Sequence, residues 1–260
     1  MSVVSWEVTS TPSPLVLLLL LQAFVLPACG DSRTPAERPP PGSLSAPRRL
    51  PPSARRAQAE YAASEASRLL DEEDLAGARM QLEAALALEP MNRRAQMVSG
   101  QAYHAEGRDA EALHAFQRAL DIDEDLGVRE WMGLTFLALR DTALSDSPAE
   151  GESRSPQELA HAALEQFQIA VALEPTSANA RHNLGYTHRL AGEYPESARI
   201  LEQLLEEDPQ RLLSMFELGM TLEAAGRRGE ALATYERVLG VMPGHEKALL
   251  AVQRLEPEGS

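Results

Sequence analysis

The sequence predicts an all-α fold in which about five helical hairpins stack into a solenoid and a final helix closes the array. Three observations predict it. A pattern of small and bulky residues recurs through residues 58–245. Aromatic residues are scarce, at 5%, a composition that suits closely packed helices. Prolines recur where the repeats end, and a proline lacks the amide needed to continue a helix.

Each predicted hairpin carries a small residue in both of its helices. In the first helices a bulky residue usually follows three positions later, in the pairs Ala66/Leu69, Gly100/Tyr103, Gly133/Phe136, Gly185/His188 and Gly219/Leu222. The second helices have a bulky residue four positions later and an apolar one three further on, as in Ala78/Leu82/Ala85, Ala112/Phe116/Ala119, Ala163/Phe167/Ala170, Ser197/Leu201/Leu204 and Ala231/Tyr235/Val238. These spacings place the residues on one helix face. A small residue there would let the two helices approach, and a bulky side chain of the partner would fill the space.

The repeats have nearly constant length. Their second-helix small residues are separated by 34, 51, 34 and 34 residues, which indicates a repeat protein. Four units end at a proline, and Glu124 stands in the remaining slot; the prolines are Pro90, Pro175, Pro209 and Pro243. The predicted units are 59–92, 93–125, 126–177, 178–211 and 212–245. Residues 246–255 should form a helix that covers the last apolar face, followed by a short tail to residue 260.

The third unit is long because it contains an extra segment. Residues 141–158 are polar and acidic and are interrupted by Pro148 and Pro156, so we expect a loop. A tolerated surface loop and a partner contact are both compatible with this composition.

At these residues the chain resembles the tetratricopeptide repeat family. The first-helix motif of the family is matched by Met132-Gly133, Leu184-Gly185 and Leu218-Gly219, and its second-helix motif by Ala112/Phe116, Ala163/Phe167 and Ala231/Tyr235. The resemblance covers residues 59–245 and implies a right-handed α-solenoid. It also implies that the first helices line a concave wall along which extended or helical peptides bind.

Transferred to this chain, the resemblance implies a groove for a protein partner. The implied groove residues are Arg94, Met97, Gln101, His104, Glu130, Trp131, Leu134, Asn179, His182, Asn183, Tyr186, Arg189, Leu213, Phe216 and Met220. Asn183 matches an asparagine that often pairs with the peptide backbone in the family. The Lys/Arg/Asn clamp that some members use for a terminal carboxylate does not occur here. We expect Trp131, Tyr186 and Phe216 to be the main anchors. For each residue, packing against the next hairpin remains the alternative.

Residues 1–28 are expected to be a lipoprotein-type signal peptide. The apolar run 15–26 is uncharged but too short to span a membrane, as in signal peptides. It leads into Leu26-Pro27-Ala28-Cys29, which resembles the bacterial lipobox. That resemblance implies cleavage before Cys29 and a diacylglycerol on its thiol. A secretory signal with an incidental cysteine, or a misassigned start codon, are the alternatives.

Residues 29–57 are expected to be an extended tether. Seven prolines lie among Ser, Ala and Arg, with too little apolar surface to offset the entropy of ordering. Such a tether would hold the folded part off the membrane. Gly30 after the cysteine favours the periplasmic face of the outer membrane, by analogy with lipoprotein sorting.

Charge and missing motifs argue against several function classes. The net charge is −15, and the residues beyond 57 carry −18, which disfavours nucleic acid and would attract a basic partner. A solvated acidic surface is the plainer interpretation. The six histidines form no metal-binding motif, and no nucleotide-binding or hydrolase motif occurs. We therefore expect no cofactor, no metal, no small-molecule substrate and no enzymatic activity.

The leading hypothesis is a membrane-tethered scaffold that mediates protein–protein interaction in a cell-envelope assembly. One alternative is an enzyme or accessory subunit acting on cell-wall polymer, although the sequence offers it only carboxylates and scattered histidines. Another is a structural protein that associates with itself through exposed end helices.

Overall fold

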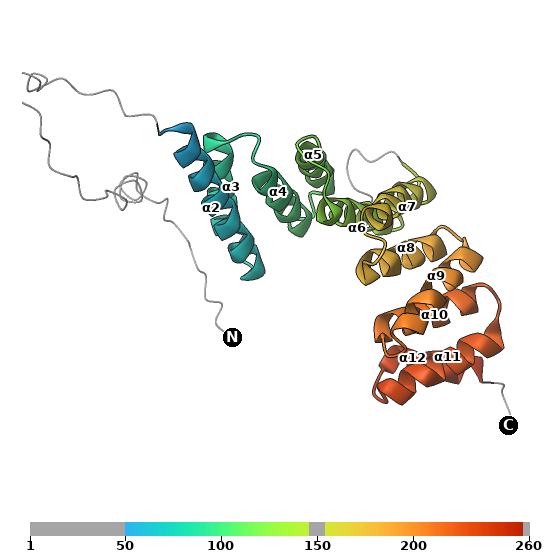
Figure 1. The fold of residues 1–260 in the computed structure, drawn as a ribbon. Coiled ribbons are helices and arrows are strands. Elements are labelled where there is room, and N and C mark those ends of the chain that lie inside the picture. Colours follow the sequence, from blue (N-terminus) through green and yellow to red (C-terminus); the bar gives the residue numbers. More distant parts are fainter. Residues whose placement is uncertain (1–49, 146–153, 257–260) are drawn as a thin grey trace, which may run out of the picture. The chain divides into compact units, whose positions relative to one another are not determined.

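The computed structural model describes residues 50–145 and 154–256 (Figure 1). The expected signal peptide, Cys29 and most of the expected tether lie outside these ranges. Within them the chain forms eleven α-helices and no strand: α2 (Pro52–Asp71), α3 (Leu75–Leu88), α4 (Arg93–Ala105), α5 (Asp109–Leu120), α6 (Leu126–Ala143), α7 (Pro156–Leu173), α8 (Ala178–Leu190), α9 (Tyr194–Glu207), α10 (Leu212–Ala224), α11 (Arg228–Val241) and α12 (Glu246–Leu255). None of these helices is long and apolar enough to cross a membrane. The all-α solenoid is confirmed.

The helices pack as five consecutive hairpins and a final helix. The main contacts are α2 with α3, α4 with α5, α6 with α7, α8 with α9 and α10 with α11, and α12 packs on α11. Successive hairpins are joined through second-to-first contacts such as α5 with α6 and α9 with α10. The apolar faces thereby merge into a core that continues from one hairpin to the next, as a solenoid requires.

Helix ends follow from capping residues and prolines. The first helices α4, α6 and α8 begin after Asn92, Asp125 and Ser177, whose side chains accept hydrogen bonds from free backbone amides of the first turn. α12 begins in the same way after His245. The predicted prolines lie two residues beyond the last residue of α3, α7, α9 and α11. The array therefore restarts at the expected residues in units two to five and in the final helix.

Glycines in the first helices permit the close approach that the spacing predicts. A Cβ added to Gly100 would lie 2.4 Å from a ring carbon of Phe116. Gly133 and Phe167 stand in the same relation at 2.6 Å, as do Gly219 and Tyr235 at 2.6 Å; the corresponding contact of Gly185 with Leu201 is looser, at 3.0 Å. In units two to five the second helix thus places a bulky side chain directly over the first-helix glycine.

The turn between the two helices of a hairpin also has a recurring residue, which adopts a positive φ angle. Gly107, Gly192 and Gly226 adopt positive φ angles, and Glu73 does so in the first unit with φ 61°. Glu73 and Gly107 are 34 residues apart, as are Gly192 and Gly226. Left-handed backbone costs a residue with a side chain about 1–2 kcal/mol, so the first unit has a strained turn where units two, four and five have glycine.

Two predicted boundaries need correction. α2 begins at Pro52, so six residues assigned to the tether are helical. Proline is favoured in the first helical turn, and the Ala, Arg and Gln residues that follow are good helix formers. The predicted loop 141–158 is also too long, because α6 continues to Ala143 and α7 already starts at Pro156. Ser155 and Glu158 form a capping box there, a start signal within the segment assigned to the loop.

Candidate protein-interaction site

The predicted groove residues lie on α4, α6, α8 and α10, the first helices of units two to five. α4 contacts α6, and α8 contacts α10, so these helices follow one another across the array. None of the fifteen residues is buried: Arg94, Leu134, Asn179 and Leu213 are exposed, and the others are partly exposed. We call these fifteen residues the first-helix face.

The aromatic anchors are held in place by packing. The Trp131 indole stacks on the Phe116 ring at a centroid distance of 6.5 Å and meets the His104 ring edge-on at 5.8 Å. Met97, Trp131 and Tyr186 are all partly buried against one core cluster, which spans units two to four. These side chains present a fixed surface, so a ligand would not have to order them first.

Several polar residues of the face are already engaged within the array. Arg189 pairs with Glu217 of the next first helix, and the two side chains are only 14% and 9% exposed. Further contacts within the described chain join Arg94 to Glu60, His104 Nδ1 to Asp109 at 2.6 Å, His182 Nδ1 to Ser214 at 3.0 Å, and Arg211 as donor to the Asn179 side-chain oxygen at 2.6 Å. These five face residues therefore contact neighbouring side chains of the array, which is the alternative to contact with a partner.

Burial changes the protonation of two groups on the face. It lowers the pKa of His182, with a smaller effect from the charge of Arg211, so this imidazole favours its neutral form. Burial and the nearby charge of Glu174 raise the pKa of Glu130. One Glu130 carboxylate oxygen is buried and has no hydrogen-bond partner in the described residues. A donor supplied by a ligand would relieve that cost.

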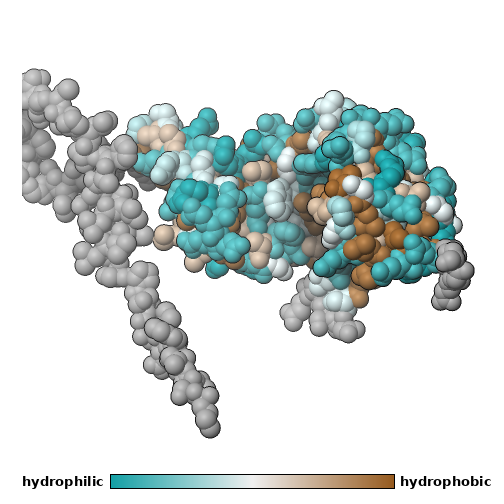
Figure 2. Space-filling view, turned by 90° about the horizontal axis from the view of Figure 1, so that it is seen from below, coloured by the Kyte–Doolittle hydropathy of each residue, from teal (hydrophilic) through white to brown (hydrophobic). Residues whose placement is uncertain are grey.

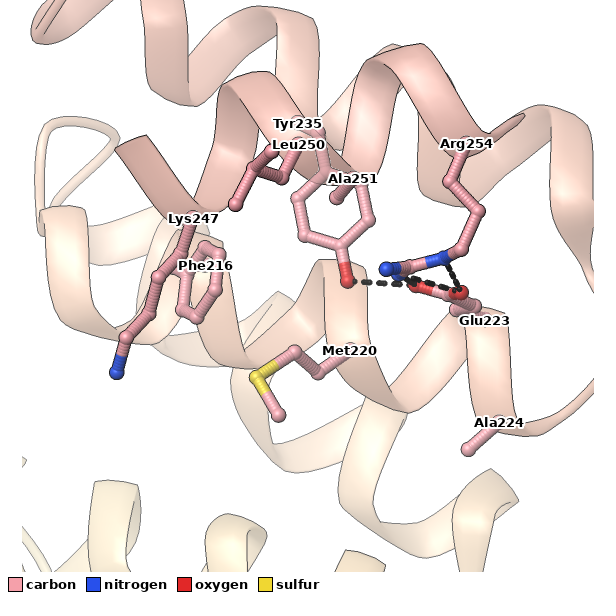
Figure 3. Close-up of a pocket in the computed structure, with 9 residues that line it drawn as sticks. All are labelled: Phe216, Met220, Glu223, Ala224, Tyr235, Lys247, Leu250, Ala251 and Arg254. Carbon is pink, nitrogen blue, oxygen red and sulfur yellow. Dashed lines mark hydrogen bonds and ion pairs between the residues drawn. The ribbon is translucent and has the colours of Figure 1, made fainter. Parts of the chain in front are cut away.

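A pocket extends the face beyond the predicted residues (Figure 3). It has a volume of about 630 Å³ and lies between α10, α11 and α12. Its lining includes Phe216 and Met220 of the face, together with Glu223, Ala224, Tyr235, Lys247, Leu250, Ala251 and Arg254. Figure 2 looks from the side of α11 and α12 and shows hydrophobic surface gathered there, where Val241, Met242, Leu249 and Leu250 are exposed.

Sequence reasoning missed the α12 side of this pocket, although a signal was present. Adding the 34-residue period to Leu213, Phe216 and Met220 leads to Lys247, Leu250 and Arg254. α12 therefore continues the first-helix register and stands in the position of a sixth first helix. The slot of Gly219 is taken by Gln253, which is exposed.

Metal-binding geometry does not occur in the described ranges: no three or more His, Cys, Asp or Glu side chains converge closely enough to hold a metal ion. His188, placed in the core by the sequence pattern, is indeed buried, and its Nδ1 lies 2.6 Å from Glu193.

Comparison with known proteins identifies the repeat. The tetratricopeptide repeat model matches residues 63–126, 157–211 and 191–248. No match was found among curated proteins. Similar solved structures include YrrB, described as a tetratricopeptide repeat protein with an unusual peptide-binding site, at 22% identity and a TM-score of 0.59 over 74% of this chain and 90% of that one.

Two further solved structures have a similar fold. PilF of Pseudomonas aeruginosa is 16% identical, with a TM-score of 0.61 over 78% of this chain and 84% of that one. PilW, a type IV pilus biogenesis factor, is 20% identical, with a TM-score of 0.60 over 76% and 90%. The repeat fold is that of a protein–protein interaction scaffold. Because the family model matches more than half of the sequence, this chain belongs to the tetratricopeptide repeat family.

Proposed function

We propose that this protein is a scaffold, anchored to a membrane through Cys29, that holds a peptide or helix of another protein against its first-helix face. The observation that carries the proposal is the accessibility of that face. All fifteen residues chosen from the repeat motif keep exposed surface, and Leu213 is 71% exposed. Large apolar side chains left open along one series of helices favour a binding surface.

The polar groups of the face suit a peptide backbone. Asn183 and Gln101 make no side-chain hydrogen bond within the described ranges, so their amides are open to a ligand. Glu130 supplies an acceptor without a partner in the same part of the chain. Backbone N–H and C=O groups of a bound segment would pair with these side chains while its apolar residues contact Trp131 and Tyr186.

The charge of the array favours a basic segment over its first four units. Residues 58–211 carry a net charge of −16, whereas residues 212–256 carry −1. A field of this sign attracts a basic partner, and the attraction weakens as salt is added.

The proposed anchor rests on the sequence Leu26-Pro27-Ala28-Cys29 and its resemblance to the lipobox. The proposed location is the periplasmic face of the outer membrane, in a cell-envelope assembly. The fold it shares with a pilus biogenesis factor is compatible with such a role, although that description belongs to the other protein.

The binding face is tested by affinity capture of the native protein from detergent extracts, followed by mass spectrometry. The variant Trp131→Ala/Tyr186→Ala should lose the partner. Because Trp131 also contacts core residues, a second variant, Leu134→Lys/Leu213→Lys, adds charge to exposed positions and leaves the core intact. The matched control Met80→Lys/Leu173→Lys alters exposed second-helix positions and should keep the partner. Equal capture by all variants would remove the first-helix face from the proposal.

The anchor is tested separately. Cys29→Ser, or treatment with globomycin, should release the protein from the membrane fraction and remove the mass of the lipid. Unchanged fractionation and mass would reject lipidation without affecting the binding face.

A further inference from the structure

We propose that the pocket between α10, α11 and α12 anchors a protein segment that carries two large apolar side chains with an Asp or Glu side chain beside them. The inference rests on the proposed scaffold function and specifies the chemistry of the partner at the C-terminal end of the array.

The pocket has an apolar floor and walls. Tyr235 is 1% exposed and lies at the bottom, with Phe216 packed against its ring at 5.6 Å. Met220 forms the α10 wall and Leu250, 62% exposed, the α12 wall. The volume of about 630 Å³ lies in the range of ligand pockets and exceeds what one side chain fills. It suits neighbouring apolar residues on one face of a helix or strand.

The walls are fixed before anything binds. Arg254 of α12 donates to both carboxylate oxygens of Glu223 of α10, at 2.8 and 2.9 Å. The Tyr235 hydroxyl donates to the same carboxylate at 3.0 Å (Figure 3). Phe216 also contacts the His245 ring at 4.7 Å. These links join α10, α11 and α12, so the pocket keeps its shape without a ligand and binding loses little entropy.

One positive charge at the rim is unmatched. Lys247 is the only lysine of the chain, and its ammonium makes no ion pair or hydrogen bond within residues 50–145 and 154–256. Arg254 is neutralised by Glu223. Figure 3 shows Lys247 and the Arg254–Glu223 pair at opposite ends of the pocket. A ligand whose apolar residues fill the centre would therefore gain from a carboxylate at the Lys247 end.

Residues 1–28 contain Trp6 and Glu7 among valines, but they are removed under the proposed cleavage before Cys29, and the other segments outside the described ranges do not have that chemistry. Residues 146–153 and 257–260 contain no large apolar side chain. Residues 29–57 carry six arginines against two carboxylates and would be repelled by Lys247. The occupant we infer is therefore a segment of a separate protein.

The first test selects peptides from a random displayed dodecapeptide library on the full protein. We expect enrichment of sequences with two large apolar residues within four positions of Asp or Glu. Leu250→Ser and Lys247→Glu should each weaken the enriched peptides at least tenfold, and selection on Lys247→Glu should favour Lys or Arg flanks. Arg237→Glu, the same charge change at an exposed α11 position, should alter affinity less than twofold.

The second test uses the single lysine. A carbodiimide condenses a bound peptide's carboxylate with the Lys247 amine to an amide, and the reagent leaves as a urea. Mass spectrometry should locate the peptide on Lys247. Lys247→Arg keeps the charge but not the reactive amine, so binding should stay within twofold while the cross-link disappears.

The outcomes separate the inference from the scaffold function. Suppose that the enriched peptides bind Leu250→Ser as well as the parent protein but lose affinity for Trp131→Ala/Tyr186→Ala. That result would overturn the proposed binding in the pocket and support binding on the first-helix face. Absence of any enriched peptide that loses affinity for both Leu250→Ser and Lys247→Glu would overturn the inference, whereas basic peptides that bind these variants as well as the parent protein would report on the acidic first four units. A Lys247 cross-link to a second copy of this chain would also overturn the inference, because it would show the pocket to be an interface between copies.

Discussion

Replacing Gly100 by alanine tests the packing principle on which every hairpin depends. The new Cβ would lie 2.4, 2.6 and 2.7 Å from three carbons of the Phe116 ring. Comfortable carbon contacts are about 3.5–4.0 Å, so the ring would have to move by about 1 Å. Phe116 is fully buried, so its ring cannot move out into solvent without disturbing its neighbours.

Two opposing free-energy terms set the expected change in the stability of Gly100→Ala. Overpacking a well-packed core costs about 1–3 kcal/mol. Alanine in place of glycine stabilises a helix by about 1 kcal/mol. With contacts this short we place the clash near its upper end, which leaves a net loss of about 2 kcal/mol. The effect should be largest in the second unit.

Urea unfolding followed by circular dichroism measures the loss, and amide hydrogen exchange locates it. The control Gly240→Ala lies in α11 with nothing within 4 Å of the new Cβ, and should leave stability unchanged or raise it by up to about 1 kcal/mol. Gly185→Ala, facing the flexible Leu201 at 3.0 Å, should fall between the two. If Gly100→Ala is as stable as Gly240→Ala, close helix approach does not explain the glycine pattern.

Three further predictions concern single side chains. Glu73→Gly should stabilise the first unit by about 1 kcal/mol, because glycine adopts positive φ without strain; thermal unfolding that shows no gain would contradict this. Since the pKa of Glu130 is raised, the folded state loses stability as pH rises from about 4.5 through that pKa. Glu130→Gln should therefore stabilise the protein at pH 7 but not at pH 4. Urea unfolding at both pH values measures this, and a substitution effect of equal size at pH 4 and pH 7 would contradict the burial argument. Arg189→Met should lower the free energy of unfolding by about 3 kcal/mol, because it leaves the nearly buried Glu217 carboxylate without its partner. The double variant Arg189→Met/Glu217→Leu should recover most of that loss. If urea unfolding shows no recovery, the unpaired carboxylate is not the cause of the loss.

Much of the fold followed from the sequence because the interactions that define it are periodic. A glycine or alanine under a bulky side chain must recur at each hairpin, and so must the stop after the second helix. The boundaries of units two to five therefore emerged from spacing alone. Pro52 and Pro156 were harder to interpret, since proline both interrupts loops and starts helices.

The candidate site was less predictable because its residues serve two purposes. The repeat register correctly chose accessible positions, but it does not say which of them are engaged by neighbouring hairpins. Arg189 and His182 illustrate this: their partners Glu217 and Ser214 lie 28 and 32 residues away, and no local pattern shows the pairing. Lys247 and Leu250 follow from the sequence only when the repeat register is extended into α12, because a final helix is otherwise expected just to cover the core.

Gln253 affects how closely a further helix could pack on α12. Where four earlier first helices have glycine, α12 has a long polar side chain, so a further second helix cannot approach closely. An insertion that supplied glycine at this slot together with a matching second helix would lengthen the protein by one whole hairpin. The extent of partner that the array can hold would therefore grow in discrete steps of about 34 residues.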